Sequence, residues 1–159
     1  KQQFARSGKI IEVPNVENFS KFESIVESKL PRGYFLPKNM ESIVTLLKKH
    51  GVKVVQLNSS KKVKGEIFIV EKLNKAEKEF EGHFMATVEG KFISKTETFN
   101  KGDYWIDMAQ PLTNLIFYML EPQSDDGLLT WNFFDTYFYE QGIKTKPVSY
   151  PVFKCYMLP

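Results

Sequence analysis

The clearest periodic pattern lies early in the chain. Apolar side chains recur at helical spacing over residues 40–47, which predicts a helix that Asn39 can cap and Gly51 can end. A short apolar run at 34–36 precedes it, and a run rich in β-branched residues at 52–57 follows it. Strand, helix and strand with short connections predict a βαβ-like unit.

The middle third has the composition of β-strands. Runs rich in Val, Ile, Phe and Thr cover residues 66–73, 83–99 and 104–108, which predicts strands. Glu89-Gly90-Lys91 predicts a break inside the second run, and residues 100–103 predict a turn before the third. We therefore expect an antiparallel sheet here.

Helical spacing returns after Pro111. Residues 112–120 place their apolar side chains on one face, and Pro122 ends the pattern. The tail, 147–159, alternates apolar residues with three prolines, which predicts either an edge strand or an extended tether.

These elements together predict an α+β fold. The N-terminal βαβ-like unit is followed by a mostly antiparallel β-sheet with a second packed helix. Residues 1–30 are expected to form a linker segment, and residues 31–159 a single α+β domain.

Composition and charge argue against two classes of function, nucleic-acid binding and membrane spanning. The chain has 159 residues, 42% apolar and 26% charged, which is typical of a folded domain with its own core. The net charge is +3, and the lysines are interleaved with Asp and Glu along the chain. No clustered basic stripe therefore predicts a nucleic-acid partner. No apolar run approaches the roughly 18 residues that span a membrane, so no membrane span is expected.

Motifs for catalysis are missing from the sequence. His50 and His83 each lack a glutamate three residues later, so neither forms the His-x-x-Glu pair of zinc hydrolases. Cys155 is the single cysteine and cannot make an intrachain disulfide. A hydrolase built on His83 with Glu81 or Asp103 is the weakest alternative. We predict no catalytic residues and no metal site in this chain.

Two groups of residues are candidates for binding. Trp105 and Trp131, with nearby tyrosines, could form a stacking platform for a glycan or a peptide, although dense aromatics more often lie in a core or an interface. Glu121, Asp125 and Asp126 could bind calcium. They lack the alternating spacing of a calcium loop, which favours a solvated loop.

Several stretches between residues 31 and 135 form an ordered set. They are Pro31-Arg32-Gly33-Tyr34 with Pro37, residues 47–54, Glu81-Gly82-His83, Phe99 with Lys101-Gly102-Asp103-Tyr104, Gln110-Pro111, Leu120-Glu121-Pro122-Gln123-Ser124-Asp125-Asp126-Gly127-Leu128, and then Trp131 with Phe133-Phe134. In order and spacing, this set resembles the region that follows the catalytic domain in bacterial secreted zinc metallocarboxypeptidases of the carboxypeptidase A-like family.

The resemblance implies a role beside an enzyme. The zinc ligands and the catalytic glutamate of that family would lie in an upstream peptidase catalytic domain, so zinc is expected only there, and the location is expected to be extracytoplasmic. The expected function is a non-catalytic C-terminal accessory domain that assists proteolysis, and the alternative is a self-contained glycan- or peptide-binding module. Taken together, the motifs and aromatics give these candidate binding residues: Arg32, His83, Trp105, Gln110, Glu121, Asp125, Asp126 and Trp131.

Overall fold

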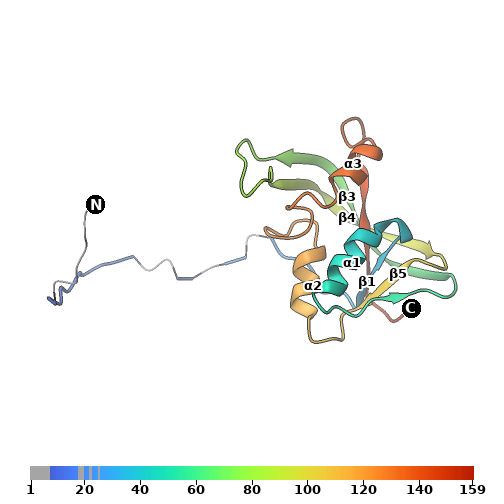
Figure 1. The fold of residues 1–159 in the computed structure, drawn as a ribbon, viewed down its shortest axis with the longest axis horizontal. Coiled ribbons are helices and arrows are strands. Elements are labelled where there is room, and N and C mark those ends of the chain that lie inside the picture. Colours follow the sequence, from blue (N-terminus) through green and yellow to red (C-terminus); the bar gives the residue numbers. More distant parts are fainter. Residues whose placement is uncertain (1–7, 18–19, 22, 25) are drawn as a thin grey trace.

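The chain folds around one six-stranded sheet (Figure 1). The computed structural model describes residues 8–17, 20–21, 23–24 and 26–159. Its elements are β1 (Gly33–Leu36), a 3-10 turn η1 (Lys38–Met40), α1 (Glu41–Lys49), β2 (Val55–Gln56), β3 (Lys61–Lys75), β4 (Ala86–Phe99), β5 (Tyr104–Asp107), α2 (Thr113–Leu120), α3 (Asp135–Glu140) and β6 (Val148–Cys155). The strand order is β2-β5-β1-β6-β3-β4, and every neighbouring pair is antiparallel. The predicted α+β class is confirmed.

The N-terminal unit is a split βαβ. Strands β1 and β2 both run antiparallel to β5, which lies between them, so they are parallel to each other without being neighbours. Gly51 ends α1 with a positive φ of 89°, and the Val52 amide donates to the Leu47 carbonyl at 3.1 Å. The predicted cap at Asn39 is wrong, because the chain enters the helix through η1 and the N-cap falls on Met40.

Strands β3 and β4 form one long hairpin. The break predicted near Gly90 is wrong, because β4 continues through it and the pairing only shifts register opposite Val70 and Lys72. A Cβ on Gly90 would lie 2.0 Å from the Ile69 carbonyl oxygen. Glycine here therefore permits close backbone approach at a β-bulge, where the sequence pattern predicted a break between strands.

The C-terminal tail forms a central strand. Strand β6 pairs with β1 on one side and β3 on the other, so both predictions for the tail, an edge strand and a tether, are wrong. The pairing of β3 with β6 shifts register between Ile67 and Ile69. Pro151 lies in this irregular stretch, where the missing amide donor does not interrupt a regular ladder.

The two faces of the sheet carry separate cores. Strand alternation turns Tyr34 and Ile106 toward the face covered by the three helices, and it turns Phe35 and Trp105 toward the other face. On that second face Phe35 stacks on Phe99 with ring centroids 4.5 Å apart. Within the described residues, no helix has the length and apolarity to cross a membrane.

Residues 8–17 lie outside both cores. They are exposed and contain no helix or strand, and Figure 1 shows this stretch running away from the sheet. The chain meets the body of the fold just before β1, where the Arg32 amide donates to the Cys155 carbonyl at 2.8 Å.

Candidate functional site

A group of charged and polar side chains lies on the face of the sheet that the helices cover. Alternation along β6 places Tyr150, Val152 and Lys154 on that face. Glu121 follows the last residue of α2 and turns inward toward Lys154. Tyr34 of β1 and Ser28 complete the group, which we call the charge cluster: Ser28, Tyr34, Glu121 and Lys154.

An ion pair and several short hydrogen bonds connect the four residues of the charge cluster. Lys154 Nζ lies 2.8 Å from Glu121 Oε2, and Tyr34 donates its hydroxyl hydrogen to Glu121 Oε1 at 2.6 Å. Ser28 donates to Glu121 Oε2 at 2.6 Å and accepts from Lys154 Nζ at 2.6 Å. The Lys154 ammonium also lies 4.2 Å from the centre of the Phe92 ring, where the ring's electron density favours a cation.

Burial sets the electrostatics of this group. Lys154 is 2% exposed and Glu121 is 5% exposed, so each charge depends on the other for compensation. Burial lowers the pKa of the Lys154 ammonium, and the Glu121 carboxylate opposes that shift. Burial, followed by the Glu121 charge, raises the pKa of the Tyr34 and Tyr150 hydroxyls. The Tyr150 hydroxyl is buried and has no hydrogen-bond partner within the described structure.

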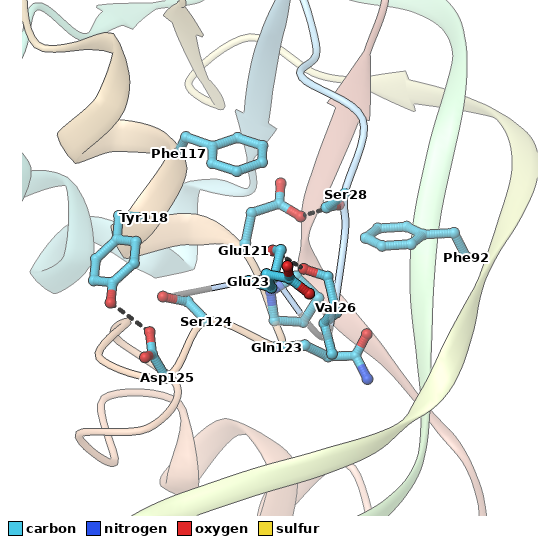
Figure 2. A pocket seen from close by; sticks show the side chains of 12 residues that line it. Glu23, Val26, Ser28, Phe92, Phe117, Tyr118, Glu121, Gln123, Ser124 and Asp125 are labelled. Carbon is cyan, nitrogen blue, oxygen red and sulfur yellow. Dashed lines mark hydrogen bonds between the residues drawn. The ribbon is translucent and has the colours of Figure 1, made fainter. Parts of the chain in front are cut away.

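A pocket of about 470 Å³ lies above the charge cluster. Figure 2 shows Glu121 in its centre, with Phe117 and Phe92 on two sides and Tyr118 bonded to Asp125 at the edge. Ser28 and Val26 line it from the segment that precedes β1. The pocket therefore has aromatic walls, and the buried carboxylate in it is already paired.

A second region carries aromatic side chains on the outside. The loop between β3 and β4 meets the segment before α3, where His83 Nδ1 lies 3.2 Å from Asn132 Oδ1 and Asn132 donates to the Phe84 carbonyl at 2.9 Å. Phe80 is 56% exposed and Phe133 is 50% exposed. We call this region the aromatic surface: Phe80, His83, Phe84, Trp131 and Phe133.

The rings of the aromatic surface are not coplanar. The Phe80 and Trp131 rings are 6.2 Å apart and inclined by 48°, and His83 meets Trp131 edge-on at 85°. Trp131 is half-buried, and its indole N–H donates to Asp126. The surface therefore presents ring edges and corners, whereas a stack of sugars needs a flat platform.

Two of the candidate binding residues support the fold locally. Arg32 forms a two-point ion pair with Asp107, in which Nη2 lies 2.9 Å from Oδ2. The Gln110 side chain accepts from the Lys53 amide at 2.8 Å and donates to the Asp107 carbonyl at 2.6 Å. Both side chains tie the segments around β5 together.

The remaining candidates are divided between core and surface. Trp105 is 7% exposed and packs on Phe35 in the second core, so its ring offers no exposed stacking surface. The acidic group does not converge, because Glu121 turns inward while Asp125 and Asp126 accept from Tyr118 and Trp131. In the part of the chain that the structure describes, no three His, Cys, Asp or Glu side chains gather as a metal site would require.

For the hydrolase alternative around His83, the structure speaks against one of the two proposed acids, Asp103. His83 lies in the loop that begins β4, and Asp103 lies beyond the far end of that 14-residue strand. The Asp103 carboxylate accepts from the backbone amides of Lys38 and Asn100, at 2.8 and 2.6 Å. Asp103 thus organises a turn far from the histidine.

Sequence reasoning missed Lys154, Tyr34 and Ser28. A signal for Lys154 was present, since it stands two residues after Val152 and four after Tyr150 on a strand of alternating apolar residues. A lysine on the inward face of such a strand requires a buried acid as partner. No local pattern identifies Ser28, whose contact with Glu121 spans 93 positions.

Comparisons with protein-family models, curated proteins and solved structures return no match for this chain.

Proposed function

We propose that this chain is a non-catalytic accessory domain that packs on the catalytic domain of a zinc carboxypeptidase and assists proteolysis. The observation that supports it is the aromatic surface, in which Phe80, Phe84 and Phe133 are each about half exposed. Clustered exposed aromatics are typical of protein interfaces, where such rings supply much of the binding energy.

The sequence resemblance supplies the identity of the partner. The stretches that carry it include Glu81-Gly82-His83 and Leu120 to Leu128, and both border the aromatic surface through His83 and through the bond between Asp126 and Trp131. The zinc and the catalytic glutamate would belong to the partner domain. Such an enzyme would act outside the cytoplasm.

The alternative, a glycan- or peptide-binding module, has less support. It needs exposed rings lying roughly in one plane. Trp105 is buried in the second core, and the rings around Trp131 are inclined by 48° and 85°. Tilted rings suit the uneven surface of a protein domain better than the flat face of a sugar.

The first experiment compares the purified chain alone and in a mixture with a carboxypeptidase A-like catalytic domain from the same genome. Bound zinc, hydrolysis of a C-terminal peptide bond and the melting temperature of the catalytic domain are measured. We expect neither zinc nor hydrolysis from the chain alone, and greater activity or stability of the catalytic domain on mixing. Stoichiometric zinc with cleavage by the chain alone would overturn the proposal.

A further inference from the structure

The segment before β1 lies against the charge cluster. We call residues 26–30 the strap, and two of them, Val26 and Ser28, line the pocket beside Phe92 and Phe117 (Figure 2). The strap contains no helix or strand. Its attachment therefore depends on individual side-chain and carbonyl contacts.

Lys154 holds the strap. Its ammonium has three N–H donors, and three acceptors surround it: Glu121 Oε2 at 2.8 Å, Ser28 Oγ at 2.6 Å and the Lys29 carbonyl at 3.2 Å. Two of the three acceptors belong to the strap. The Ser28 hydroxyl contacts both charges of the buried pair, since it also donates to Glu121 at 2.6 Å.

The rest of the strap is weakly attached. Val26 and Leu30 are each at least half exposed, and Glu27 and Lys29 are exposed as well. The Lys29 ammonium lies over the Tyr156 ring at 4.6 Å, a contact of modest strength at an exposed site. Segments with few buried contacts open at a small fraction of the free energy of global unfolding.

Opening of the strap would leave the charge pair intact. Glu121 would keep Lys154 and Tyr34 as partners, and water would replace the two acceptors that leave. The sheet itself does not depend on the strap, because β6 remains paired with β1 and β3.

We propose that the strap is a latch, which opens and closes over the Glu121–Lys154 pair while the sheet stays folded. In the closed state Lys154 is sealed from water. In the open state Lys154 and Glu121 form the polar floor of a groove between Phe92 and Phe117. The latch also fixes the point at which the chain N-terminal to β1 leaves the fold, and it does not depend on the proposed partner.

The test measures how fast Lys154 reacts in the full chain under native conditions. Lysines are acetylated with an amine-specific reagent, and the modification of each is followed by peptide mass spectrometry, with the exposed Lys64 as internal reference. We expect Lys154 to react more slowly than Lys64, at a rate nearly independent of low concentrations of denaturant. A local opening exposes little surface and therefore depends weakly on denaturant.

Three variants separate the latch from general loosening. Ser28→Ala removes the hydroxyl that contacts both charges, and we expect acetylation of Lys154 to accelerate about tenfold. Ser28→Thr keeps a hydroxyl and should retain the wild-type rate. Ser59→Ala is the matched control, because Ser59 is exposed and its hydroxyl donates to Asn58 Oδ1 at 3.3 Å, outside the strap and the charge cluster.

Two results would overturn the latch. One is a Lys154 rate that follows global unfolding across the denaturant series in the wild-type chain. The other is an unchanged Lys154 rate in Ser28→Ala. The first measurement needs no variant, so the proposal is decided even if a substitution impairs folding.

Discussion

The charge cluster and the aromatic surface place their side chains in opposite ways. Lys154 and Glu121 are charges on the inside, each with several partners. Phe80 and Phe133 are apolar rings on the outside, half exposed to water. The first arrangement is complete within the chain, whereas the second becomes favourable when another surface covers it.

One loop joins the two regions. Glu121 stands at the start of the stretch that ends with Trp131, and Asp125 and Asp126 between them bond to Tyr118 and Trp131. Acidic residues that lie close together in the sequence therefore have different structural roles. The inward acid stabilises the fold, and the outward acids orient the side chains at the surface.

The largest effect should come from breaking the buried pair. Lys154→Met leaves the Glu121 carboxylate buried without its cation, and we expect a loss of about 3–5 kcal/mol in the free energy of unfolding. Denaturant titration measures it. The double variant Lys154→Met/Glu121→Gln should lose less than the sum of its single variants, because it leaves no unpaired charge. A near-wild-type Lys154→Met would show that the pair is unimportant.

The second largest effect should come from alkaline pH, which should lower the free energy of unfolding through two buried tyrosines. The pKa values of the Tyr34 and Tyr150 hydroxyls are raised in the fold, so their protonated forms favour the folded state. That contribution is complete below the unfolded value near pH 10 and is lost as the pH rises above it, by about 1.4 kcal/mol per pH unit for each tyrosine. Stability measured on both sides of about pH 10 checks this. A flat profile would contradict the burial of both hydroxyls.

Removal of one hydrogen bond should have a smaller effect. Tyr34→Phe deletes the hydroxyl that donates to Glu121 at 2.6 Å, while the ring can stay in place. We expect a loss of about 1–3 kcal/mol, because a buried carboxylate loses a donor. Tyr104→Phe is a matched control, since Tyr104 is a buried tyrosine on the neighbouring β5, whereas the hydroxyl that donates to Glu121 is that of Tyr34. Equal losses in the two variants would contradict a special role for Glu121.

The smallest effect on stability is expected at the aromatic surface. Phe80→Ser should change the free energy of unfolding by no more than about 1 kcal/mol, because half of the ring is already in water. The same titration measures it. A loss as large as that of Lys154→Met would make Phe80 a core residue and would remove it from the proposed interface.

The elements that depend on local residue patterns could be predicted from the sequence. Helix α1 and its stop at Gly51 follow from apolar spacing and a left-handed glycine, and the turn before β5 follows from Asn100 to Asp103. The central position of β6 was missed, because prolines in a tail suggest an edge, and only the register shift on β3 explains how Pro151 is accommodated.

The site was harder to predict than the fold. Glu121 was a candidate for binding, but its neighbours in sequence, Asp125 and Asp126, suggested calcium or solvent. Its actual partners, Tyr34 and Lys154, come from strands 87 and 33 positions away. Contacts of that separation depend on strand order, which no single stretch of residues encodes.

The most direct test of the central proposal is binding between this chain and a carboxypeptidase A-like catalytic domain, measured by calorimetric titration. Three forms are compared: the wild-type chain, the double variant Phe80→Ser/Phe133→Ser, and Val55→Ser, which alters an exposed apolar side chain on the edge strand β2. We predict that the wild-type chain and Val55→Ser bind equally well, and that the double variant binds at least tenfold more weakly, a difference of about 1.4 kcal/mol. Equal binding by all three forms, or binding by none, would contradict the assignment of the aromatic surface as the docking site for that enzyme.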